Sequence, residues 1–196
     1  NTTRWTRFIA PEGRIQIVPP PVALFTSEVD PDDHAMDDSF GYTGATPLSR
    51  ADGRPLPLLS ELKYFGFLDP ALGRSTTRDG DYASIVTIGR DANGITYVID
   101  VWMEKARPHR QVDRIFELHQ QYKYTMFGYE ANGFQESLGR EIDLGRIRAQ
   151  EKGLHTRFHL QKKENTENKH ARICCIEPAI IAGSVRFQAN LPVEFY

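Results

Sequence analysis

The chain has 196 residues, of which 40% are hydrophobic, and its formal net charge is -2. This size fits one domain with a sizeable core, or one domain with an extension. The near-neutral charge excludes a globally basic protein, so any nucleic-acid binding must come from a local patch, and the lack of a long apolar run argues against a membrane-spanning helix.

The first 61 residues differ in composition from the rest of the chain. Two short apolar runs, residues 15–18 and 22–25, are compatible with strands or extended arms. An acidic run at 28–33 and a stretch rich in Gly, Ser and Pro at 41–57 follow them. Such composition is typical of linkers and loops. We therefore interpret residues 1–61 as an N-terminal extension or linker.

Residues 62–196 have the pattern of an α/β domain. Aromatic and β-branched residues predict three strands, at 64–68, 84–89 and 95–103, and the last two are joined by a tight turn at 91–94. A helix is predicted from Pro108, where the missing N–H of proline does no harm. Its apolar face recurs at three- to four-residue spacing and consists of Val112, Ile115, Phe116 and His119.

The second half of this domain alternates strands and helices. Strands are predicted at 124–129, 155–160 and 184–187, helices at 134–150 and 169–182, and a polar loop at 162–168. In the first of these helices Leu138, Ile142 and Ile147 are expected on one face, and Gly183 closes the second. A disulfide between the adjacent Cys174 and Cys175 is not expected, because neighbouring residues point in different directions. We expect both to be reduced, buried small residues.

This order of elements predicts the sheet. Three strands joined by short turns should be antiparallel neighbours, and later strands that alternate with helices should join by crossovers. The result is a mixed sheet flanked by helices, consistent with the ribonuclease H-like class of α/β fold.

Two acids stand at equivalent places, at the ends of two predicted strands. Asp69 ends the first strand and Glu130 ends the fourth. If the two strands lie side by side and parallel, both carboxylates meet at one edge of the sheet. They would repel each other unless a divalent cation sits between them, and hard oxygen ligands favour Mg²⁺ or Mn²⁺. The alternative for Asp69 is an Asp-Pro turn, and for Glu130 an acid in a turn.

Asp81 stands just before the second strand. It is a candidate for a further metal ligand or for an acid that orients a water molecule. An ordinary acid after a glycine turn is the alternative.

Several segments resemble the nuclease domain of the large terminase subunit of tailed bacteriophages. The resemblance covers roughly residues 62–196 and rests on the order and spacing of short motifs. They are Phe67-Leu68-Asp69-Pro70-Ala71-Leu72-Gly73, Gly80-Asp81-Tyr82-Ala83, Gly94-Ile95-Thr96-Tyr97-Val98-Ile99-Asp100, Tyr129-Glu130-Ala131-Asn132-Gly133-Phe134-Gln135, Lys169-His170-Ala171-Arg172-Ile173 and Gly183-Ser184-Val185-Arg186-Phe187.

The resemblance implies a metal-dependent endonuclease, located in the host cytoplasm, that cleaves concatemeric double-stranded viral DNA during genome packaging. Asp69 and Glu130 would be ligands of two Mg²⁺ or Mn²⁺ ions, with Asp81 as a supporting acid. Lys169 matches a basic position near the family's active site and would contact the scissile phosphate. The implied partners are the packaging ATPase domain of the same polypeptide, the small terminase subunit and the portal protein.

Two departures from the family pattern matter. The family's third acid follows the last strand, but this chain ends at Tyr196 without it, so we expect that ligand beyond Tyr196. The Gly-rich phosphate loop of a packaging ATPase is also absent, so no ATPase activity is expected.

Basic residues supply candidate DNA contacts. Arg and Lys side chains bind phosphates without reading sequence, which suits a nuclease with little sequence preference. The candidates are Arg74, Arg78, Arg107, Arg110, Arg140, Arg146, Arg148, Lys162, Lys163 and Arg172. Two other functions stay open: another ribonuclease H-like DNA-processing enzyme, such as a resolvase or transposase core, and a non-catalytic docking module of a packaging motor.

Overall fold

The computed structural model describes residues 6–18, 55–71, 81–130, 135–164 and 169–191; for residues 135–137 and 169–173 it describes the backbone alone. The strands are β1 (Arg7–Ile9), β2 (Gln16–Val18), β3 (Lys63–Asp69), β4 (Ala83–Arg90), β5 (Thr96–Glu104), β6 (Met126–Glu130), β7 (His159–Lys163) and β8 (Val185–Gln188). The helices are α1 (Pro108–Tyr122), α2 (Gln135–Glu151) and α3 (Lys169–Ile181), with short 3-10 turns at Pro11–Gly13 and Leu59–Glu61.

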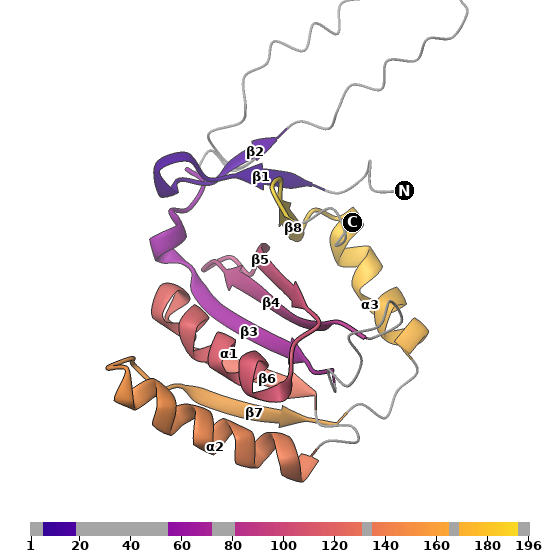
Figure 1. Ribbon diagram of the computed structural model, residues 1–196. Helices are drawn as coiled ribbons and strands as arrows, with labels where there is room; N and C mark the ends of the chain where they lie inside the picture. Colours follow the sequence, from indigo (N-terminus) through magenta and orange to yellow (C-terminus); the bar gives the residue numbers. More distant parts are fainter. Residues whose placement is uncertain (1–5, 19–54, 72–80, 131–134, 165–168, 192–196) are drawn as a thin grey trace, which may run out of the picture.

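The described strands form one mixed sheet in the order β2-β1-β8-β5-β4-β3-β6-β7 (Figure 1). β3, β4 and β5 are antiparallel neighbours, as predicted. β6 lies parallel to β3, and β7 lies parallel to β6. The predicted crossovers through α1 and α2 are therefore confirmed.

The turn between β4 and β5 follows from its residues. Asp91 Oδ1 accepts hydrogen bonds from the backbone N–H groups of Asn93 (2.8 Å) and Ile95 (3.1 Å). Gly94 has a φ of +84°, a left-handed conformation that glycine adopts without a steric penalty. The turn sets the register in which Arg90 faces Thr96.

Helices α1 and α2 cover one face of the sheet, as Figure 1 shows. Their buried residues pack with Leu68, Ile85 and Phe127 in one core cluster. Helix α3 approaches the other face, where Ala179 and Ile180 pack against a cluster from β4, β5 and β8. The helices α1 and α2 thus cover one face over β3, β4, β6 and β7, and α3 covers the other face near β8.

The described N-terminal residues belong to this sheet. β1 pairs with β8, and Phe8 and Ile15 are buried beside Leu62 and Tyr97. The rings of Phe8 and Tyr97 meet edge to face at 5.4 Å. The division of the chain at residue 61 stays a prediction, and residues 22–25 lie outside the described residues.

Three expectations were wrong in detail. Ile147 is 52% exposed, and the buried stripe of α2 instead consists of Leu138, Ile142, Gly145 and Ala149, because their spacing keeps to one face of the helix. Cys174 and Cys175 are not joined in a disulfide, as predicted, but both are exposed rather than buried.

The third wrong expectation concerns β7, which begins at His159 and includes Lys162 and Lys163, both of which were expected in a loop.

None of the described helices is long and apolar enough to cross a membrane.

Candidate active site at one edge of the sheet

Asp69 and Glu130 end two neighbouring parallel strands. Leu68 of β3 is the register partner of Tyr129 of β6, and each acid is the next residue in its strand. The prediction that these two strands lie side by side and parallel is therefore confirmed. Asp69 is exposed and Glu130 is half-buried.

Both acids belong to the same face of the sheet. Side chains alternate between faces along a strand. Leu68 and Tyr129 pack against the core beneath α1 and α2, whereas Phe67 and Gly128, one residue earlier, line the opposite face. Asp69 and Glu130 continue the alternation on this opposite face, which we call the open face.

A basic residue extends the row of strand ends. Lys163 of β7 is the register partner of Glu130, and it also lines the open face. On the other side, Ser84 of β4 is the partner of Asp69. The edge therefore presents Ser84, Asp69, Glu130 and Lys163 from four adjacent strands.

A buried glutamine anchors the chain just after Asp69. Gln111 of α1 is fully buried, and its Nε2 donates hydrogen bonds to the carbonyl oxygens of Ala71 (2.6 Å) and Ala106 (2.7 Å). Since Ala71 lies two residues after Asp69, this amide fixes where the chain leaves β3. Sequence reasoning missed this role.

Of the other candidate residues, the structure describes some in full, some by their backbone alone and some not at all. Asp81 is exposed just before β4, on the same edge as the Asp69–Ser84 pair. Lys169 and Arg172 lie in α3, but their side chains are outside the described residues, as are Arg74 and Arg78 altogether. Arg140 is exposed on α2, which covers the opposite face.

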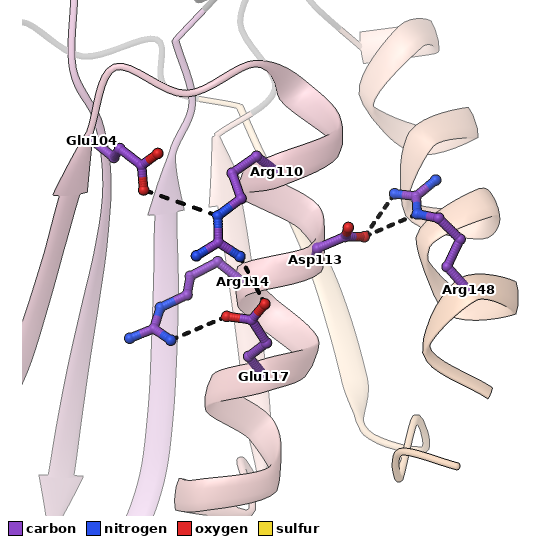
Figure 2. A network of polar contacts seen from close by, with 6 residues as sticks. All are labelled: Glu104, Arg110, Asp113, Arg114, Glu117 and Arg148. Carbon is purple, nitrogen blue, oxygen red and sulfur yellow. Dashed lines mark hydrogen bonds and ion pairs between the residues drawn. The ribbon is translucent and has the colours of Figure 1, made fainter. Parts of the chain in front are cut away.

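Two of the basic candidates are engaged by acids of the protein itself (Figure 2). Arg148 of α2 donates to Asp113 of α1 through Nε (3.0 Å) and Nη2 (2.8 Å), and to Glu141 (2.9 Å). Burial disfavours its charged form, but these two acids outweigh that effect and raise the pKa of Arg148. Arg110 bonds Glu117 at 2.7 Å. The contact between Arg148 and Asp113 ties α2 to α1, and the contact between Arg110 and Glu117 joins two turns of α1.

Lys162 and Lys163 point to different sides. Lys162 forms an ion pair with Glu164 at 2.8 Å, which lowers the pKa of Glu164. Lys163 makes no ion pair with any described residue. Side chains alternate between the two faces along a strand. A strand predicted to extend to residue 163 would therefore have placed the two lysines on opposite faces.

The open face contains a hollow of about 470 Å³ between the carboxylate edge and the opposite edge of the sheet. Its floor is apolar and includes Phe65, Phe67 and Met126, with Lys163 toward one end and Arg90 toward the other. The hollow was not among the features predicted from the sequence, although strand alternation places Phe65, Phe67 and Asp69 on one face.

A pair of histidines lies on the covered face, away from these acids; His119 is buried and His155 is exposed. His119 is 3% exposed, its Nε2 lies 3.2 Å from Nδ1 of His155, and its ring stacks on Phe158 at 4.2 Å. Burial, followed by the charges of His155 and Lys123, lowers the pKa of His119 to about 4. The expected placement of His119 on the core face of α1 is confirmed.

Asp69 and Glu130 offer a divalent cation the hard oxygen donors that it prefers. Within the described ranges no three His, Cys, Asp or Glu side chains gather into a metal-binding group. The pair therefore fits a metal as part of a ligand set.

No family model and no curated protein sequence matches this chain. Among solved structures, it is similar to a human cytomegalovirus terminase nuclease domain, soaked with Mn and inhibitor-bound, at 12% identity over 68% of each chain and a TM-score of 0.50. It also matches the large terminase nuclease of thermophilic phage G20c, at 13% identity over 67% of this chain and 61% of that one, with a TM-score of 0.43.

A third match is the nuclease domain of the large terminase subunit gp2 of bacterial virus Sf6, at 10% identity over 64% of this chain, 63% of that chain and a TM-score of 0.42. The chain thus spans less than two thirds of either phage domain. The likeness to the cytomegalovirus terminase nuclease domain is one of fold, and together with the sheet topology it supports the predicted ribonuclease H-like mixed sheet flanked by helices.

Proposed function

We propose that this chain is a metal-dependent DNA endonuclease of the terminase type. The observation that carries the proposal is the placement of Asp69 and Glu130 at the ends of adjacent parallel strands, on the same open face of the sheet. The shared fold with a terminase nuclease domain supports the same reaction class.

Asp69 and Glu130 would hold Mg²⁺ or Mn²⁺, with Asp81 as a supporting acid. When bound, such ions would supply an activated water and would stabilise the leaving oxygen of a phosphodiester. The protein's own part is positional: β3 and β6 hold the carboxylates in one register row, and Gln111 fixes the chain after Asp69.

Basic side chains near this edge would bind DNA phosphates without reading sequence. In this proposal the substrate is concatemeric double-stranded viral DNA, cut during packaging alongside an ATPase domain, a small terminase subunit and a portal protein. Lys169 would contact the scissile phosphate.

The test is nicking of supercoiled plasmid DNA in Mn²⁺ by the wild-type chain, Asp69→Asn and Glu130→Gln. These substitutions keep side-chain size and remove the negative charge. Each should reduce the rate by about 100-fold or more, while Glu151→Gln, an exposed acid at the end of α2, should cut like wild type. If the wild type nicks and both site variants match it, the assignment of the site is wrong.

A competition between a four-way junction and a linear duplex separates this function from a resolvase. A terminase-type nuclease should cut both substrates, whereas strong preference for the junction favours the resolvase. Failure of the wild-type chain to cut or to bind Mn²⁺ in titration calorimetry would favour a docking module.

A further inference from the structure

The hollow on the open face exposes strands that proteins usually cover on both sides. β3, β6 and β7 are parallel to one another, and parallel strands are usually buried on both faces. Here α1 and α2 cover one face, but the described residues leave Phe65, Phe67 and Met126 partly exposed on the other. Partly exposed aromatic rings beside a predicted catalytic edge point to a ligand with an apolar, flat surface.

The floor of the hollow is shaped by a glycine. A Cβ atom at Gly128 would lie 2.7 Å from Cδ2 of Phe67, closer than real side chains approach. The absence of that atom lets the Phe67 ring lie across β6 and widen the apolar floor. Phe67 is also the residue that precedes Asp69 by one strand pleat on the same face.

The two charged side chains that line the hollow itself are both basic. Lys163 lines it at the carboxylate edge and Arg90 lines it at the far end. Lys163 makes no ion pair within the described part of the chain, in contrast with Lys162, which pairs with Glu164. A ligand that fits both features carries a flat ring and a neighbouring negative charge.

The volume suits such a ligand. Small-molecule sites measure roughly 300–1,000 Å³, and the hollow measures about 470 Å³. An aromatic platform flanked by basic side chains is the arrangement by which proteins bind single-stranded nucleic acid, with bases on the rings and phosphates on the cations.

We propose that the hollow is a subsite for an unpaired nucleotide next to the cut, with its base stacked on Phe67 and its phosphate at Lys163. This inference rests on the proposed nuclease function and extends it. The enzyme then engages DNA whose bases are locally unpaired at the cleavage point, and binds single strands through the hollow.

The test measures binding without cleavage. Fluorescence anisotropy of a labelled single-stranded oligonucleotide and of its duplex is followed in EDTA, for wild type, Phe67→Leu and Phe67→Tyr. Loss of one stacked base should weaken single-strand binding by about 5- to 150-fold in Phe67→Leu, while duplex binding stays within about twofold. Phe67→Tyr keeps the ring and should bind like wild type.

A second variant pair tests the phosphate contact. Lys163→Met should lower the salt dependence of single-strand binding by about one phosphate contact, a slope change of about 0.7. Lys152→Met is the control: this exposed lysine directly follows α2, which covers the opposite face of the sheet, so its replacement should leave the slope unchanged.

The outcomes are separable. If Phe67→Leu binds single strands like wild type, or loses duplex and single-strand binding equally, the nucleotide subsite is wrong, even where Asp69→Asn abolishes cleavage. Selective loss in Phe67→Leu, with full binding retained in Phe67→Tyr, supports the subsite even where no cleavage is detected, a result that would count against the proposed function alone.

Discussion

Gln111 donates a hydrogen bond of 2.6 Å to the carbonyl oxygen of Ala71, and so links the first turns of α1 to the chain just after Asp69. The same amide nitrogen donates to Ala106 at 2.7 Å, and the side chain is fully buried. One polar side chain in the core therefore determines where a candidate metal ligand leaves its strand.

Gln111→Leu is expected to impair the site more than the fold. It leaves two buried carbonyl oxygens without their donor, at a cost of about 1–3 kcal/mol in the free energy of unfolding. It also releases Ala71, so Mn²⁺ affinity and nicking per folded molecule should fall. Denaturant unfolding and Mn²⁺ titration measure the two effects.

Thr87→Val is the matched control for that variant. It breaks the buried 2.7 Å hydrogen bond between Thr87 and Tyr124 in the same core, but does not touch the chain after Asp69. It should lower stability to a similar extent and leave Mn²⁺ affinity unchanged. Equal loss of metal binding in both variants would refute a positioning role for Gln111.

The pairing of the two acids could be predicted, because strand ends and crossovers are properties of local sequence. Asp69 and Glu130 each follow a buried run, and a parallel arrangement follows from the helix between them. Lys163 could not be placed, since residues 162–168 are polar and suggest a loop. β7 reaches Lys163 because β6 offers it hydrogen-bond partners as far as Glu130.

Contacts between distant segments were also beyond sequence reasoning. Ile147 is apolar but lies away from the stripe of α2 that faces α1, and an isolated helix pattern does not show where the neighbour's groove lies. The hydrogen bonds of Arg148 to Asp113 and of Gln111 to Ala71 each join residues more than one element apart. They depend on packing, which a single sequence does not reveal.

Arg148→Met is expected to weaken the packing contact between α1 and α2. The guanidinium of Arg148 bonds the partly buried carboxylates of Asp113 and Glu141, which the variant would leave facing each other without a cation. The free energy of unfolding should fall by about 1–3 kcal/mol. Arg148→Lys should recover only part of it, because lysine lacks the planar fork.

Arg140→Met serves as the comparison for Arg148→Met in urea unfolding. Arg140 is exposed on the same helix, so its replacement should change stability by no more than about 0.5 kcal/mol. A similar loss in the two variants would mean that removal of positive charge from α2, rather than the Asp113 contact, causes the effect.

Stability should depend on pH through His119. Its pKa is lowered from 6.5 to about 4, so the unfolded chain takes up a proton at this residue before the folded chain does. Stability from this group is therefore complete above pH 6.5 and declines as the pH falls toward 4. The charged or titratable neighbours are His155 and Lys123, and the rings of Tyr124 and Phe158 pack against it.

His119→Phe keeps an aromatic ring in that stack and removes the titration. The midpoint of thermal unfolding should then change less between pH 6.5 and 4 than in wild type, whereas His109→Gln, at an exposed position of α1, should retain the wild-type slope. An unchanged slope in His119→Phe would assign the acid sensitivity to other groups.

Two glycines of α2 should respond to alanine with opposite signs. A Cβ at Gly145 would collide with Cγ1 of the fully buried Val112, so Gly145→Ala overpacks the contact between α1 and α2. The expected loss is about 1–3 kcal/mol in the free energy of unfolding. A Cβ at Gly139 meets nothing within 4 Å. Gly139→Ala should therefore add about 0.4–1 kcal/mol by restricting the unfolded chain.

Urea unfolding of the two variants tests this pair directly, since both changes add one methyl group to the same helix. Helix propensity alone would stabilise both proteins. A gain in Gly139→Ala with a loss in Gly145→Ala shows that α1 packs against α2 through Gly145. A gain in both would mean that the helices lie further apart than the contact with Val112 requires.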